Sequence, residues 1–168
     1  SIDMNPFNPH QATTPEPPAE RQVVTFQTAG TVYGLEIDAV QELLAFDGFT
    51  PLPESPPYSP GTFDLRGLVV PAVDLRLRLG LESREYNRYT VIVVIRSARG
   101  MFGLVVDKVS DVLGLTPDKF QSAPGDALGG TGGHIASVAH SEAGLVYLLN
   151  PDRLTGTDLE TPAQDPGF

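Results

Sequence analysis

The chain has 168 residues, 40% of them apolar, and a formal net charge of −10 from 21 acidic and 11 basic residues. That length and apolar content suffice for one ordinary domain or for two small barrels that share an interface. The acidic balance disfavours nucleic acid and anionic membrane surfaces as partners, because Lys and Arg supply most of the affinity for both. The chain has no cysteine, which excludes disulfides, thiolate metal sites and cysteine nucleophiles.

The longest uninterrupted aliphatic run, Val91–Ile95, is far shorter than the ~20 residues of a membrane span. The N-terminus has neither the charged start nor the apolar core of a signal peptide. We therefore expect a soluble, cytoplasmic protein without direct membrane insertion.

Both ends of the chain are rich in proline and polar residues. Residues 1–21 contain Pro6, Pro9, Pro15, Pro17 and Pro18, and residues 156–168 have a similar composition. Such segments bury too little apolar surface to offset the entropy lost on ordering. We expect disordered tails at 1–21 and 156–168 around a folded domain over 22–155.

The folded part begins with two β-rich runs, Val23–Gln27 and Thr31–Ile37. Ala29–Gly30 between them is typical of a hairpin turn. The elements expected next are a short helical turn over Ala39–Gln41 capped by Asp38, a strand near Leu43–Phe46, and a rigid proline-rich loop over Thr50–Gly61.

The stretch Phe63–Leu81 holds an apolar run, Leu68–Val73, that is interrupted by Pro71. A proline cannot donate to a sheet ladder, so this strand should lie at an edge or kink at a bulge. The residues after it fit two structures. The alternating leucines from Leu75 onward favour a strand, whereas Asp74 as N-cap and Gly80 as stop favour a helix.

The second half repeats the pattern of short strands and turns. About nine or ten short strands with turns every 8 to 12 residues indicate an all-β barrel or sandwich. The elements expected here are a pair Val91–Ile95 with Met101–Val106, a strand Val109–Leu115, a last pair Ser137–His140 with Leu145–Leu149, and a helical turn opened by Asn150–Pro151.

Three segments in order resemble the CheW family, the coupling proteins of bacterial chemotaxis arrays. They read TFQTAGTVYGLEIDAVQELL, DLRGLVVPAVDLRLRLG, and YNRYTVIVVI followed by FGLVVDKVSDVLGLTPDKFQSAP. The resemblance covers roughly residues 22–155 and favours a helix after Asp74. It implies two intertwined five-stranded SH3-like barrels with a few short helical turns. Barrel one would hold roughly 22–66 plus 141–155, and barrel two roughly 67–140.

The resemblance also selects Arg66 and Gly67, which lie in the family's functional motif. From the sequence alone, the favoured role of Arg66 is a structural salt bridge that closes a turn, and only the resemblance favours a binding role. Glu42 is a candidate partner, because a carboxylate can hold a guanidinium by two parallel hydrogen bonds. Asp64 stands where the family usually has Asn, so its charge could compete with Glu42 for Arg66.

Five further positions match family positions implicated in binding receptors or the kinase. As single residues they are equally consistent with core packing. As a set they would form an apolar groove for the tip of a helical hairpin. They are Val40, Val91, Gly103, Val109 and Val112.

The sequence offers little support for phosphate binding, metal binding or catalysis. The segment Gly125–His134 lacks the Lys and Ser or Thr of a phosphate-binding loop, so a mobile loop is expected. His134 and His140, with Asp126 and Glu142 nearby, could in principle hold a metal. Asp107 and Asp111 favour surface positions. HExxH and GxSxG motifs are missing, so we expect no catalytic residue, no cofactor and no metal.

The resemblance implies a non-enzymatic adaptor between the cytoplasmic tip of a chemoreceptor and the regulatory domain of a CheA-type histidine kinase. Such an adaptor would be monomeric alone and assembled in arrays at the membrane. Three alternatives stay open: a coupling paralogue of a pilus or other chemosensory array, the regulatory domain of a chemotaxis kinase, and a small-ligand-binding β-barrel with the glycine-rich loop as its lid.

Overall fold

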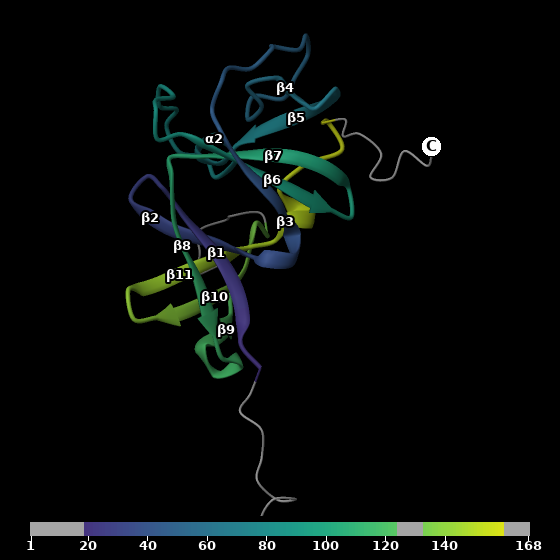
Figure 1. Cartoon of the computed structure of the whole chain (residues 1–168). Helices are drawn as coiled ribbons and strands as arrows, with labels where there is room; N and C mark the ends of the chain where they lie inside the picture. The colour runs from purple at the N-terminus through teal and green to yellow at the C-terminus, as the bar shows by residue number, and fades with distance from the viewer. Residues whose placement is uncertain (1–18, 124–132, 160–168) are drawn as a thin grey trace, which may run out of the picture.

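The computed structural model describes residues 19–123 and 133–159, which form two β-sheets and a few short helical turns (Figure 1). Sheet one has the strand order β8-β1-β2-β11-β10-β9, and sheet two has the order β3-β6-β7-β5-β4. Within the described part, no helix is long and apolar enough to cross a membrane.

The strands of sheet one come from the two ends of the folded region. All its neighbours are antiparallel except β11 and β2, which run parallel. The strands are β1 Arg21–Thr28, β2 Thr31–Glu36, β8 Lys108–Leu115, β9 Phe120–Ser122, β10 Ile135–Ser141 and β11 Gly144–Leu149.

Sheet two comes from the middle of the chain. Its one parallel pair is β5 with β7. The strands are β3 Val40–Ala45, β4 Thr62–Leu65, β5 Leu68–Asp74, β6 Val91–Ser97 and β7 Gly100–Val106. The helical elements of the whole described part are η1 Ile37–Ala39, α2 Leu75–Arg78, η2 Pro117–Lys119 and η4 Pro151–Arg153.

The strands β6 and β7 read as unbroken apolar runs because each is buried on both faces. Side chains alternate along a strand, so Val93 and Ile95 of β6 enter a core shared by the two sheets. Ile92 and Val94 enter a second cluster together with Phe63 of β4. Sheet one has its own cluster, which includes Val23, Ala139, Val146 and Leu148.

The expected all-β architecture with a few helical turns is confirmed, but the strands are divided between the sheets differently. β3 and β4 were expected in barrel one and lie in sheet two, whereas β8, β9 and β10 were expected in barrel two and lie in sheet one. The chain changes sheets at η1 and again at Asp107, not near residues 66 and 140. Sheet one also has six strands instead of five, because the short β9 pairs with β10.

Two local predictions can be compared with the structure around Asp74. The helical alternative is correct there, because the Asp74 side chain accepts a hydrogen bond from Leu77 N–H and α2 follows. β5 is not an edge strand. Pro71 lies opposite Thr62 of β4, and the pairing with β7 begins one residue later at Ala72. The missing N–H of Pro71 therefore falls where β5 changes partners.

The helical turn expected at Ala39–Gln41 lies slightly earlier, at η1, and Glu36 instead of Asp38 occupies the N-cap position. The expected tails also need correction at their inner ends. Residues 1–18 and 160–168 lie outside the described residues, but Arg21 already belongs to β1.

Residues 156–159 pack against the folded domain instead of belonging to a tail. Gly156 N–H donates to the Tyr58 hydroxyl at 3.1 Å, and that hydroxyl donates to Asp158 Oδ1 at 2.7 Å. Leu159 is buried in the shared core. The polar composition of this segment was misleading, because its anchor Tyr58 lies about a hundred residues away in the sequence.

Candidate functional site

The turn between β4 and β5 presents Arg66 to solvent. Leu65 pairs with Leu68, so Arg66 and Gly67 form a two-residue loop, with φ values of 51° and 90°. Two positive φ values define a type I′ turn, which favours Asn or Asp followed by Gly. An arginine in the left-handed region is uncommon and strained, and such strain often marks a functional position.

Glu42 of β3 fixes the direction of the Arg66 side chain. Arg66 Nη1 donates to Glu42 Oε1 at 3.1 Å, and Nη2 donates to Oε2. These hydrogen bonds lower the pKa of Glu42 and raise that of Arg66. Asp64 does not displace Glu42: its carboxylate accepts from the Gly67 N–H at 3.2 Å and so helps to close the turn. The predicted two-bond pair is therefore present.

This ion pair joins the two edges of sheet two. Glu42 lies on β3, the first strand of the sheet, and Arg66 follows β4, the last. Opposite edges can approach this closely only when the sheet is strongly curved. The guanidinium stays accessible, with 67% of the Arg66 side chain exposed against 26% for Glu42. Exposed apolar side chains lie on β3, namely Leu43, and at the start of β5, namely Leu68 and Val69.

The other five predicted positions do not come together in one groove. Val40 and Val91 are half-buried against the shared core, where β3 and β6 pair antiparallel, and they lie near opposite ends of that pairing. Gly103 is buried in β7, where an added Cβ would stand 2.5 Å from the Phe63 ring. Val109 and Val112 are exposed on β8, an outer strand of sheet one. The positions thus divide between two sheets and the interior.

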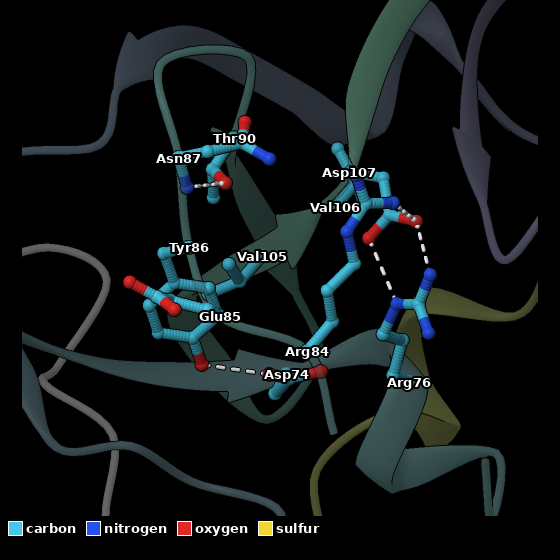
Figure 2. A pocket seen from close by; sticks show the side chains of 10 residues that line it. All are labelled: Asp74, Arg76, Arg84, Glu85, Tyr86, Asn87, Thr90, Val105, Val106 and Asp107. Carbon is cyan, nitrogen blue, oxygen red and sulfur yellow. Dashed lines mark hydrogen bonds and ion pairs between the residues drawn. The ribbon is translucent and has the colours of Figure 1, made fainter. Parts of the chain in front are cut away.

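A second charged cluster, which the sequence did not predict, lies around Asp107 (Figure 2). Asp107 had been expected at the surface, but only 18% of its side chain is exposed. Its Oδ1 accepts from Arg76 Nε at 3.0 Å, and its Oδ2 accepts from Arg76 Nη2 at 2.7 Å and from Ala29 N–H at 2.9 Å. Arg84 Nη1 lies 3.3 Å from the same Oδ2.

The Asp107 carboxylate is held in its charged form. Burial by itself raises the pKa of Asp107, but the hydrogen bonds from Arg76 and Ala29 and the charges of Arg76 and Arg84 outweigh it. The net effect lowers the pKa below its ordinary value of 3.8. Beside this cluster, the Tyr86 hydroxyl donates to the buried Asp74 at 2.6 Å, and burial followed by this bond raises the pKa of Tyr86.

The space between these residues is too small for an organic ligand. It holds about 10 Å³, roughly one water molecule, whereas small-molecule sites occupy about 300–1,000 Å³. One faint sequence signal for this cluster is an aspartate placed directly after the fully buried strand β7.

The histidines do not come together as a metal site. His140 is hydrogen-bonded to Gln121 at 2.9 Å, and His134 is half-buried, with its pKa lowered by burial and by the charges of Arg78 and Arg153. Asp126 and most of the glycine-rich segment lie outside the described residues. Across residues 19–123 and 133–159, no three His, Cys, Asp or Glu side chains are grouped as metal ligands would be.

The fold and the site describe a class of protein: a small β-domain of two sheets with an exposed arginine, held by a carboxylate, on a strained turn. Comparison with known proteins makes this specific. A sequence model of the CheW-like domain matches residues 22–158, and the chain therefore belongs to the CheW-like family.

Several relatives can be compared in detail. The chain is 35% identical to the chemotaxis protein CheW of Klebsiella aerogenes over 104 residues, which are 62% of this chain and 63% of the relative. It is 28% identical to CheW of Bacillus subtilis over 129 residues, 77% and 83% of the two chains. The crystal structure of the scaffolding protein TtCheW from Thermoanaerobacter tengcongensis superimposes with a TM-score of 0.76 at 24% identity, over 84% and 97% of the two chains, and shares the fold.

Proposed function

We propose that the protein is a non-enzymatic adaptor that couples the cytoplasmic tip of a chemoreceptor to the regulatory domain of a CheA-type histidine kinase. Membership of the CheW-like family supports this proposal, as do relatives named chemotaxis proteins and a structural neighbour described as a scaffold. Its place in the cell would then be the cytoplasmic face of membrane-associated receptor arrays, where it is monomeric until assembled.

The observation that carries the proposal is the Arg66–Glu42 pair. A strained arginine that is held by a carboxylate, yet mostly exposed, is preorganised for a partner, because little side-chain entropy remains to be lost on binding. The remaining donors of the fork face solvent and can meet an acidic or carbonyl-rich surface. Adaptor action then consists of fixing geometry and raising the effective concentration of receptor and kinase for each other.

The test is a binding measurement with purified receptor fragment and kinase, on wild type and matched variants. Arg66→Asn removes the guanidinium but introduces a residue that type I′ turns favour. A loss of binding would therefore not result from distortion of the turn. We expect wild type to bind both partners and Arg66→Asn to lose the one that contacts this turn. If wild type binds neither partner, the family relationship reports the fold alone.

The pair itself is tested by exchanging its charges. Arg66→Glu and Glu42→Arg alone should each weaken binding at this turn, and the double exchange should restore part of it if the pair sets the side-chain direction. Glu36→Gln, which removes the exposed Arg21–Glu36 pair of sheet one, is the matched control. A double exchange that recovers nothing would show that the Arg66–Glu42 pair does not set the binding geometry at this turn.

A further inference from the structure

Asp107 lies where the chain passes from one sheet to the other. It is the single residue between β7 of sheet two and β8 of sheet one. Its own N–H donates to Gln27 O of β1 at 3.0 Å, so the crossing is tied to sheet one as soon as it leaves β7. A rotation of one sheet against the other must therefore be absorbed at this residue and at η1, the other point where the chain changes sheets.

The Asp107 side chain binds both sheets at once. It accepts from the Ala29 N–H, in the turn between β1 and β2 of sheet one. It also accepts from two nitrogens of Arg76, in the helix that follows β5 of sheet two, as Figure 2 shows. Arg84, from the segment between α2 and β6, adds a third contact. We call these three partners with Asp107 the inter-sheet clasp.

The inter-sheet clasp constrains the relative orientation of the two sheets, which the packing of the shared core does not. Apolar packing between Phe26 of sheet one and residues such as Phe102 of sheet two holds the sheets together, but it is not directional. The guanidinium–carboxylate fork requires a defined angle between two planar groups. Arg76 and Asp107 have only 16% and 18% of their side chains exposed, so water weakens this pair less than a surface pair.

We propose that Asp107 is a positioning residue: the inter-sheet clasp fixes the angle between the two sheets, so that a partner bound at Arg66 on sheet two and a partner bound along β8 on sheet one influence each other. β8 begins one residue after Asp107 and carries the exposed Val109 and Val112. β8 pairs antiparallel with β1 of sheet one, and the clasp ties the start of this strand to Arg76 beside sheet two. This inference rests on the proposed function, because it needs two partners on two sheets.

The first test needs no partner. Since the chain has no cysteine, Leu43→Cys on β3 and Leu145→Cys on β11 place one spin label on each sheet at exposed positions. We expect one narrow distance distribution in the parent and a broader one after Asp107→Asn, which removes the charge at constant size. Glu36→Gln, whose ion pair joins β1 and β2 within sheet one, should leave the distribution narrow. An unchanged distribution in folded Asp107→Asn would overturn the clasp.

The second test measures coupling. The affinity for the kinase regulatory domain is determined with and without saturating receptor fragment, and the ratio of the two affinities is the coupling factor. We expect about fivefold or more for wild type, within the usual range of allosteric couplings, and about one for Asp107→Asn, with each separate affinity little changed. A purely structural role would instead lower both separate affinities together.

The outcomes separate the two proposals. If wild type binds neither partner, the proposed function fails, while the spin-label distances still test the clasp. If both partners bind and the coupling factor survives in Asp107→Asn, or is already one in wild type, the inference fails. Should Asp107→Asn not fold, Arg76→Lys keeps the charge but loses the fork, and the same broadening and loss of coupling are expected.

Discussion

The two hairpin turns at Ala29–Gly30 and Arg66–Gly67 have the same backbone conformation, but we expect the first to stabilise the fold and the second to contact a partner. Both are two-residue loops with positive φ at each position, 52° and 79° in the first and 51° and 90° in the second. In the first turn the side chain is a methyl group, and the backbone N–H of Ala29 donates to Asp107, the residue between the two sheets. In the second, an exposed arginine points to Glu42.

The difference shows that turn geometry does not decide whether a hairpin is structural or is available to a partner. The first turn is anchored by a half-buried carboxylate that also holds two arginines. The second turn is closed by the carboxylate of Asp64. The Arg66 side chain in this turn is held by Glu42 but remains accessible to solvent. Breaking the first contact should therefore affect stability, and breaking the second should affect binding.

The largest expected effect on stability comes from removing the Asp107 carboxylate. Asp107→Ala leaves the Arg76 guanidinium largely buried without its counter-ion, which should destabilise the fold by about 3 kcal/mol. Urea unfolding measures this difference. Glu36→Ala, which breaks an exposed pair, is the control and should change stability by less than about 1 kcal/mol. Equal losses in both variants would contradict a special role for the clasp.

The contribution of Asp107 should also disappear in acid. Its pKa is lower in the folded state than in the unfolded chain, so the unfolded state takes up the proton first as the pH falls. The stabilisation is therefore complete above the ordinary carboxyl pKa of 3.8 and is lost as the pH drops through the lower folded pKa. Unfolding curves between neutral pH and acid should converge for wild type and Asp107→Asn. Curves that stay parallel throughout would mean that the carboxylate is not the source of the difference.

A smaller gain in stability is expected from Ala29→Gly. Glycine adopts positive φ without strain, and the Ala29 N–H contact to Asp107 is a backbone contact that the substitution preserves. Relief of the left-handed alanine should stabilise the protein by roughly 0.5–1 kcal/mol. Thermal unfolding measures it, and a decrease would show that the methyl group itself makes a needed contact.

The smallest effect on stability is expected at the second turn. Arg66→Asn should leave the melting temperature unchanged or slightly raised, because asparagine suits the left-handed conformation and the ion pair that is lost is exposed. Binding of the partner should nevertheless be lost, so this variant separates the two uses of the same turn most clearly. A large fall in melting temperature would show that the Arg66–Glu42 pair helps to hold sheet two in its curved form.

Much of the local structure could be predicted, because it depends on neighbouring residues. Apolar runs separated by turn residues predicted the hairpin at Ala29–Gly30 and the pair of β6 with β7. Asp74 and Gly80 offered a helix as one of two alternatives for α2, and the family resemblance favoured it. The Arg66–Glu42 pair was predicted from charge complementarity and is present. Its part in binding remains a proposal, as do the parts of Val40, Val91, Val109 and Val112.

What could not be predicted depends on contacts between distant segments. From the sequence, Asp107 looks like a surface aspartate. In the fold it contacts Arg76 and Ala29, which lie 31 and 78 residues away in the sequence. Residues 156–159 resemble a tail until Tyr58 is placed beside them. The Phe63 ring of β4 lies against Gly103, a contact that the sequence did not predict, and the part of Gly103 in binding also remains a proposal.

By itself, then, the sequence determined the strands, their turns and the family, since side-chain alternation and turn residues act within a few positions. The tertiary structure alone decided which sheet each strand joins and which carboxylate crosses between sheets. Strand partners are chosen by long-range pairing, and a one-residue crossing such as Asp107 leaves no periodic signal. The carboxylate that contacts groups from both sheets was therefore visible only in the fold.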